Sequence, residues 1–159
     1  MIRIFFDMDG VLAEYKQLEL QELYKKDYFR NLEPITESLA ALRKLSENPD
    51  YEVYTLSAYL HDSAYALEEK QDWIKRYLGD TNIKSIFLPC GEKKSSAVPG
   101  GIRPTDILID DYNENLREWD THAIAIKFLN GINHKHGSWK GLTAACSCSE
   151  IIKTVYSAA

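Results

Sequence analysis

The chain has 159 residues, 45% hydrophobic and 27% charged, which is typical of one globular domain and excludes a disordered or fibrous chain. Its formal net charge of −5 gives no general attraction for nucleic-acid backbones or anionic membranes, so we expect neither as a partner. With no apolar run long enough to span a membrane and no signal-peptide pattern at the start, the sequence predicts a cytoplasmic protein.

Short apolar runs alternate with helical patterns along the chain. Strands are expected at residues 2–6, 51–57, 85–88, 107–109 and 123–128. Helices are expected at 34–48, 66–79, 113–119 and 149–156, and a helix that starts at Lys94 is cut short by Pro99. This alternation predicts an α/β fold, a single doubly wound (Rossmann-like) parallel sheet with helices on both faces.

Residues 13–32, between the first strand and the first long helix, are the one candidate for a subdomain. We call this segment the insert and expect a partly helical, small cap within a single domain of residues 1–159. It is rich in aromatic side chains, namely Tyr15, Tyr24, Tyr28 and Phe29. These rings could stack on a nucleobase or fill the core of the cap, and the sequence leaves both alternatives open.

Reactive polar residues follow four of the expected strands. They are Asp7, Ser57, the segment 91–94 and the pair Asp110-Asp111. In open α/β sheets the ligand crevice lies beyond the carboxyl ends of the strands, so these groups should meet at one edge. Two carboxylate centres, a hydroxyl and a lysine together are the groups that phosphoryl transfer requires.

The spacing of Asp7 and Asp9 suits two roles at one phosphorus atom. Side chains two residues apart in an extended chain point to the same side. One carboxylate can attack phosphorus to form an aspartyl phosphate. The second can protonate the departing oxygen and later accept a proton from the hydrolytic water.

The acidic cluster requires a cation before it can bind a phosphate dianion. Oxygen ligands with room for water and a phosphate suit Mg²⁺. Lys94 can add positive charge beside the phosphoryl oxygens, although Lys93 competes for this role. Likewise, Thr55 competes with Ser57 as the phosphate-binding hydroxyl.

These motifs resemble those of the haloacid dehalogenase-like phosphatase superfamily. The match rests on the segment from Asp7 to Leu12, a hydroxyl residue at the end of the second strand, the downstream lysine and Asp110-Asp111. Residues 27–34, the Ser57-Ala58 step and residues 69–79 resemble its 5'(3')-deoxyribonucleotidase branch. The likeness covers residues 1 to 130.

The resemblance implies a role for each matched residue. Asp7 would be the nucleophile and a metal ligand, and Asp9 the acid/base, with its backbone carbonyl also on the metal. Ser57-Ala58 and Lys94 would bind the phosphate, and Asp110 or Asp111 would complete the Mg²⁺ site. In this branch aromatic side chains of the cap hold the base, and here Tyr15, Tyr28 and Phe29 would do so.

We therefore expect a Mg²⁺-dependent phosphomonoester hydrolase. Its partner would be a small phosphorylated substrate, and a nucleoside monophosphate is the favoured candidate. A sugar phosphate or a nucleic-acid end is the alternative substrate. Outside this class, the chain could be a receiver-like domain or a catalytically inactive binding module. A receiver, however, has its paired acids near the first strand, not at Asp110-Asp111. The sequence does not decide whether the chain forms a homodimer.

Two further features have no role in this account. The segment from Asn130 to Trp139 could contact substrate, but a hydrogen-bonded turn is the favoured interpretation. Cys90, Cys146 and Cys148 have neither zinc-knuckle nor redox spacing, so we expect reduced thiols.

Overall fold

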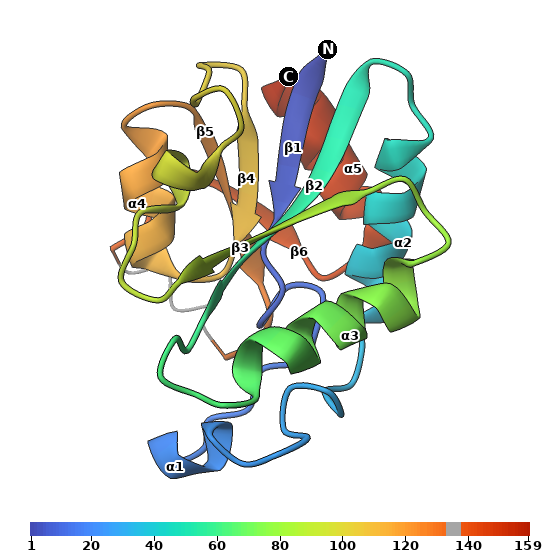
Figure 1. Ribbon diagram of the computed structural model, residues 1–159. Helices are drawn as coiled ribbons and strands as arrows, with labels where there is room; N and C mark the ends of the chain where they lie inside the picture. Colours follow the sequence, from blue (N-terminus) through green and yellow to red (C-terminus); the bar gives the residue numbers. More distant parts are fainter. Residues whose placement is uncertain (133–137) are drawn as a thin grey trace.

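The protein is built on a six-stranded parallel sheet with the order β3-β2-β1-β4-β5-β6 (Figure 1). The computed structural model describes residues 1–132 and 138–159. The strands are β1 (Ile2–Phe6), β2 (Tyr51–Tyr59), β3 (Lys84–Pro89), β4 (Ile107–Asp110), β5 (Ile124–Leu129) and β6 (Leu142–Ala145). The strand order reverses between β1 and β4, which is the topology of a doubly wound fold, as the sequence predicts.

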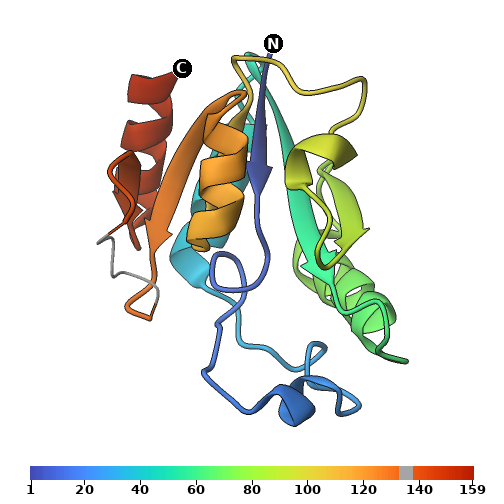
Figure 2. The same cartoon turned by 90° about the vertical axis from the view of Figure 1, so that its left-hand side faces the viewer.

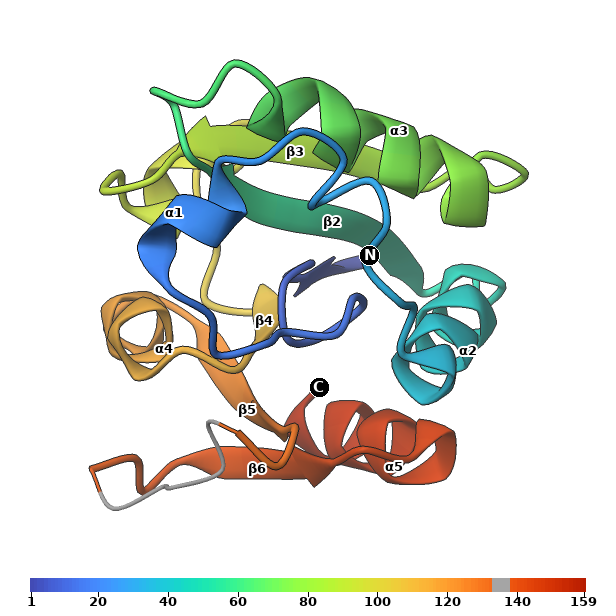
Figure 3. The same cartoon turned by 90° about the horizontal axis from the view of Figure 1, so that it is seen from below.

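Helices cover both faces of the sheet, as Figure 3 shows from below. The helices are α1 (Leu20–Leu23), α2 (Thr36–Ser46), α3 (Ala66–Leu78), α4 (Asn113–Asp120), α5 (Cys148–Ala158) and the 3₁₀ helix η1 (Lys94–Ala97). Helices α2, α3 and α5 bury their apolar sides in one core with Ile4 and Phe6 of β1. Phe5 faces the other core, with Leu116 and Trp119 of α4. This alternation along β1 follows from the two-residue period of a strand.

The insert lies beyond the carboxyl ends of the strands, as Figure 2 shows. Its two arms meet at the base, where Glu14 N donates to Glu33 O at 2.8 Å and Ile35 N donates to Leu12 O at 2.7 Å. Only α1, a single turn, is α-helical within it, so it is less helical than expected. Most of its remaining residues form turns or have no regular secondary structure.

Two further details differ from the sequence prediction. Strand β6 was not expected, because only Ala144 of its four residues is buried and the run therefore lacks a strong apolar pattern. Strand β2 extends to Tyr59, two residues beyond the expected end, because it pairs with β3 as far as Pro89. Within residues 1–132 and 138–159, none of the helices has the length and apolar character needed to cross a bilayer.

Candidate active site

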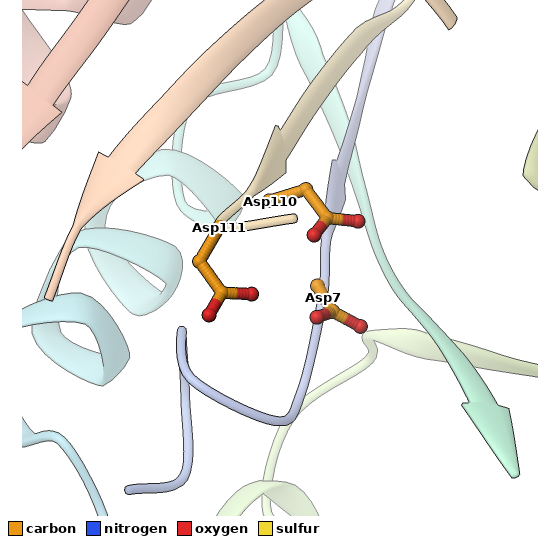
Figure 4. Close-up of side chains that lie close together, drawn as sticks. All are labelled: Asp7, Asp110 and Asp111. Atoms are coloured by element: carbon orange, nitrogen blue, oxygen red, sulfur yellow. The ribbon is translucent and has the colours of Figure 1, made fainter. Parts of the chain in front are cut away.

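Three buried aspartates meet at the carboxyl ends of β1 and β4, the two strands between which the order reverses (Figure 4). Asp7 directly follows β1, Asp110 is the last residue of β4, and Asp111 follows it. One carboxylate oxygen from each lies within 4.8 Å of the other two. The backbone joins the strands here as well, because Asp7 N donates to Ile109 O at 3.0 Å. The sequence therefore places three acids in one cluster, as expected.

Lys94 is the cation that neutralises part of this cluster. Its Nζ donates to Asp7 Oδ1 at 2.8 Å and to Asp110 Oδ2 at 2.7 Å, and its side chain is only 2% exposed. Burial alone would lower the pKa of Lys94, but the carboxylates of Asp110 and Asp7 outweigh burial and raise it. Lys93 is exposed, so Lys94 is the lysine that reaches the cluster.

Burial has the opposite effect on Asp7. Loss of solvent, reinforced by the charge of Asp110, raises the pKa of Asp7 well above its usual range, although Lys94 opposes this shift. Lys94 pairs with Asp7 and Asp110, yet the raised pKa favours the protonated form of Asp7 when no metal cation is bound. A bound cation would reverse this balance.

Helix α4 and the turn η1 hold these groups in place. Asp110 accepts hydrogen bonds from Tyr112 N at 2.9 Å and from Asn115 Nδ2 at 3.1 Å. Glu118 of α4 accepts a hydrogen bond from Ser95 N at 3.4 Å and another from the Ser95 hydroxyl, directly after Lys94. Contacts from α4 therefore fix both Asp110 and the η1 turn that carries Lys94.

Asp111 is fixed from the side of β5 and from the loop after β1. Asn130 Nδ2 donates to Asp111 Oδ2 at 2.8 Å and to Gly10 O at 3.0 Å. Gly10 has φ +79°, and a Cβ built on it would lie 2.3 Å from Asp111 Oδ2. Only glycine combines this backbone conformation with such a close approach.

Asp9 lies outside the three-acid cluster and pairs with a different lysine. Lys70 Nζ, from α3, donates to Asp9 Oδ2 at 2.6 Å, to Ala58 O at 2.7 Å and to Ser57 Oγ at 3.2 Å. The structure thus brings Asp9, Ser57 and Ala58 together through Lys70, on the α3 side of Asp7. The metal contact expected of Asp9 involves its backbone carbonyl, so its side chain is available for other chemistry.

Ser57, rather than Thr55, lies toward the carboxyl ends of the strands. Thr55 is in register with Phe6 and is fully buried, whereas Ser57 comes two residues later, beyond the last residue of β1. The Thr55 hydroxyl has no hydrogen-bond partner among the described residues.

A cavity of about 170 Å³ lies between the insert and the carboxyl ends of the strands. Asp9 and Lys70 form its polar wall, and the rest is mainly apolar. The other lining residues are Glu14, Tyr15, Leu23, Tyr28, Phe29, Leu32, Ala58, Leu60 and Cys90. The three aromatic residues expected to contact substrate all line this cavity. Tyr24 does not, and its hydroxyl instead donates to Asp62 Oδ1 at 2.9 Å.

Helix α3 anchors the second half of the insert. The carboxylate of Glu69 is buried and accepts hydrogen bonds from the backbone N–H groups of Asp27 at 2.7 Å, Phe29 at 3.2 Å and Arg30 at 3.5 Å. Trp73 Nε1 donates to Leu32 O at 2.8 Å. The position of Phe29 in the cavity wall therefore depends on α3.

Comparison with known proteins identifies the family of the chain. The family model described as "5' nucleotidase, deoxy (Pyrimidine), cytosolic type C protein" matches residues 16–143. The chain belongs to this family. The resemblance to the deoxyribonucleotidase branch of the haloacid dehalogenase-like superfamily is thereby confirmed.

A human relative agrees with this assignment. Cytosolic-type 5'(3')-deoxyribonucleotidase of Homo sapiens is 31% identical over 84 residues, which cover 53% of this chain and 38% of the human protein. The match thus spans well under half of the human relative's length.

The solved structures show the fold. D,D-heptose 1,7-bisphosphate phosphatase from B. bronchiseptica, complexed with magnesium and phosphate, matches with a TM-score of 0.67 at 16% identity, over 100% of both chains. A chain of the Pnkp1/Rnl/Hen1 RNA repair complex matches with a TM-score of 0.56 at 15% identity, over 79% of this chain and 42% of that one.

Sequence reasoning missed two residues of this candidate site. Lys70 lies in the middle of a helix, where lysines are usually solvated, yet it occupies the same helical face as Ala66, Trp73 and Ile74. That placement was the signal available in the sequence. Asn130 lies in a segment to which the sequence assigns no role. Its contact with Asp111 joins positions far apart in the chain, so no local pattern predicts it.

The segment from Asn130 to Trp139 is described in part. Asn130 Oδ1 accepts a hydrogen bond from Ile132 N at 3.0 Å, which is the kind of turn expected. Residues 133–137, including His134 and His136, lie outside the described residues. The three cysteine thiols are free, as expected, and Cys90 lines the cavity.

Proposed function

We propose that this chain is a Mg²⁺-dependent phosphomonoester hydrolase that releases phosphate from nucleoside monophosphates through an aspartyl phosphate at Asp7. The observation that carries the proposal is the contact of Asp7 with Lys94 inside a cluster of three buried acids. A nucleophilic carboxylate, a fixed cation and oxygen ligands for a metal are then within reach of one phosphoryl group.

The first half of the reaction uses Asp7 and Asp9. The Asp7 carboxylate attacks phosphorus, the bond from phosphorus to the ester oxygen breaks, and Asp9 donates a proton to that oxygen. Lys94 offsets the charge of the phosphoryl oxygens, and the Ser57 hydroxyl can donate a hydrogen bond to one of them. The products of this half are the free nucleoside and the phosphorylated Asp7.

In the second half, Asp9 acts as the base. It accepts a proton from a water molecule as the water oxygen attacks the phosphorus of the aspartyl phosphate. The bond between phosphorus and the Asp7 carboxylate then breaks, which releases inorganic phosphate and restores Asp7. Asp9 returns to the protonated state in which the cycle began.

The donor set fits Mg²⁺. Asp7, Asp110 and Asp111 offer hard oxygen ligands close together, and Lys94 pairs with two of these buried carboxylates, Asp7 and Asp110. When bound, the ion would supply charge neutralisation and orient the phosphate. The Asp9 backbone carbonyl would add a further oxygen ligand.

A nucleotide substrate is supported by the family and by the cavity beneath the insert. The family description and the name of the human relative both specify a nucleotidase. Tyr28 and Phe29 form an edge-to-face pair with ring centroids 4.9 Å apart, in the wall of a cavity that also contains Asp9. We therefore propose that the insert acts as a cap and that its aromatic wall contacts the base. The name of the human relative, cytosolic type, also supports a cytosolic location.

A substrate panel tests this proposal. We expect Mg²⁺-dependent phosphate release from nucleoside monophosphates, with higher kcat/KM than for sugar phosphates or nucleic-acid ends. Tyr28 is half-buried and its loss should leave the fold intact, so Tyr28→Ala should raise KM for nucleotides more than for an aryl phosphate. Equal KM effects on both would assign Tyr28 to packing, and a preference for sugar phosphates would overturn the nucleotide assignment.

A further inference from the structure

Lys70 is the one residue of α3 that contacts both Asp9, the proposed acid/base, and the proposed phosphate-binding residues Ser57 and Ala58. Its side chain is 1% exposed. Its ammonium donates to Asp9, Ser57 and the Ala58 carbonyl, all three within 3.2 Å. The ring of Phe29 covers it, with Nζ 4.8 Å from the ring centroid.

We propose that Lys70 is a positioning residue, which fixes the Asp9 carboxyl group in the orientation needed for proton transfer to the leaving oxygen. The inference rests on the proposed function and names a residue that acts through Asp9. Lys70 is not itself in contact with the three-acid cluster in any of its hydrogen bonds.

The contacts of Asp9 explain why it needs such a partner. One oxygen, Oδ2, accepts from Lys70, while Oδ1 is buried and has no hydrogen-bond partner among the described residues. A carboxyl group held at one oxygen keeps the other available for a substrate group. Without Lys70, the carboxyl group would lose the only side-chain hydrogen bond that the described residues give it.

Packing alone does not account for a lysine at this position. An ammonium group is costly to bury unless it is paired and hydrogen-bonded, and an apolar residue would fill the same face of α3 beside Ala66 and Trp73. Three well-placed acceptors instead match the three donors of an ammonium group. Glu69, the preceding residue, holds the insert, so the same turn of α3 sets both the cavity wall and Asp9.

The test compares substrates with different needs for a proton. A nucleoside 5'-monophosphate releases a poor leaving group that must be protonated, whereas p-nitrophenyl phosphate releases a good one. For Lys70→Met, we expect kcat/KM to fall about a hundredfold with the nucleotide and less than tenfold with p-nitrophenyl phosphate, since general acid catalysis is worth roughly 10²–10⁴-fold. Lys75→Met, an exposed lysine of the same helix, should change neither value.

A second pair of variants separates positioning from folding. Lys70→Arg keeps the charge and should recover part of the nucleotide activity. In an Asp9→Asn background, Lys70→Met should add little further loss, because the group through which it acts is gone. Unfolding temperatures of all variants show whether each is folded, and Lys70→Gln replaces Lys70→Met if the latter fails to fold.

The outcomes are distinct. Equal losses on both substrates, no loss on either, or full additivity with Asp9→Asn would overturn the role of Lys70 and leave the proposed phosphatase intact. A folded wild-type protein that hydrolyses neither substrate with Mg²⁺ would overturn the proposed function itself.

Discussion

Gly10 sets how closely the loop after β1 can approach Asp111. Its backbone has φ +79°, and its carbonyl shares the Asn130 amide with the Asp111 carboxylate. A side chain at this position would collide with an oxygen that we assign to the metal. The conformation of one residue therefore determines whether the acids of β1 and β4 can form a single site.

Gly10→Ala should reduce activity at least tenfold and weaken Mg²⁺ binding, because the added methyl group displaces the Asp111 carboxylate. Gly100→Ala is the matched control, since Gly100 also has positive φ (+70°) but has open space where the methyl group would go. It should cost about 1 kcal/mol of stability from backbone strain and leave kcat/KM unchanged. Similar kinetic losses in both variants would show that strain, not displacement of Asp111, is responsible.

At this scale the sequence identifies residues whose chemistry follows a strand end. Asp7, Lys94 and Asp110 are of this kind and lie in contact with one another, whereas Ser57 lies inside β2, which continues to Tyr59. Lys70 approaches the site from the middle of a helix, and its contacts depend on how α3 packs on the sheet. Such a residue becomes visible only once the tertiary arrangement is known.

Helix α3 is the element that joins the insert to the sheet. Its buried Glu69 accepts three backbone hydrogen bonds from the insert, and Trp73 binds the carbonyl of Leu32. Arg30 adds an ion pair with Asp72 of the same helix. The half of the insert that contributes Phe29 is thus held in a fixed position.

Glu69→Gln should loosen this half of the insert. The amide has a single acceptor oxygen and would direct its NH₂ group at a backbone N–H, which costs about 1–3 kcal/mol for a buried pair. We expect a lower unfolding temperature and a higher KM for nucleotides, with a smaller change for p-nitrophenyl phosphate. Glu68→Gln, an exposed neighbour on α3, should match the wild type. An unchanged nucleotide KM in a destabilised Glu69→Gln would show that the anchor does not shape the cavity.

The accuracy of the element predictions follows the strength of local patterns. Strands β1 and β4 and helices α2 and α3 carry continuous or periodic apolar residues and were predicted closely. Strand β6 has one buried residue, and the second half of the insert is held by hydrogen bonds to Glu69 and Trp73 of α3 rather than by its own periodicity. Neither feature leaves a clear local signal.

Three buried acids lie together at the carboxyl ends of β1 and β4. Lys94 pairs with two of them, Asp7 and Asp110, and burial raises the pKa of Asp7. An acid with a raised pKa in the folded state contributes stability that is fully present below its unfolded-state pKa. That contribution is lost as the pH rises through the folded-state value. Because of Asp7, the metal-free protein should therefore be less stable at pH 8 than at pH 5.

Mg²⁺ should counter this loss by favouring the ionised acids. We expect a saturating Mg²⁺ concentration to raise the unfolding temperature more at pH 8 than at pH 5, because protons compete with the ion at the lower pH. Asp111→Asn should reduce the Mg²⁺-dependent increase at both pH values. An increase in unfolding temperature that is equal at both pH values, or is retained in Asp111→Asn, would contradict a metal site built from these acids.

Asp7 should form a covalent bond to phosphorus during turnover, and that bond can be trapped. Wild-type protein mixed with Mg²⁺ and a nucleoside monophosphate would be quenched in acid during turnover and reduced with borohydride, which converts an aspartyl phosphate to homoserine. Peptide mass spectrometry should then find homoserine at position 7 and nowhere else, and Asp7→Asn should show neither homoserine nor phosphate release. Sustained turnover with an unmodified Asp7, or modification at another aspartate, would contradict the account.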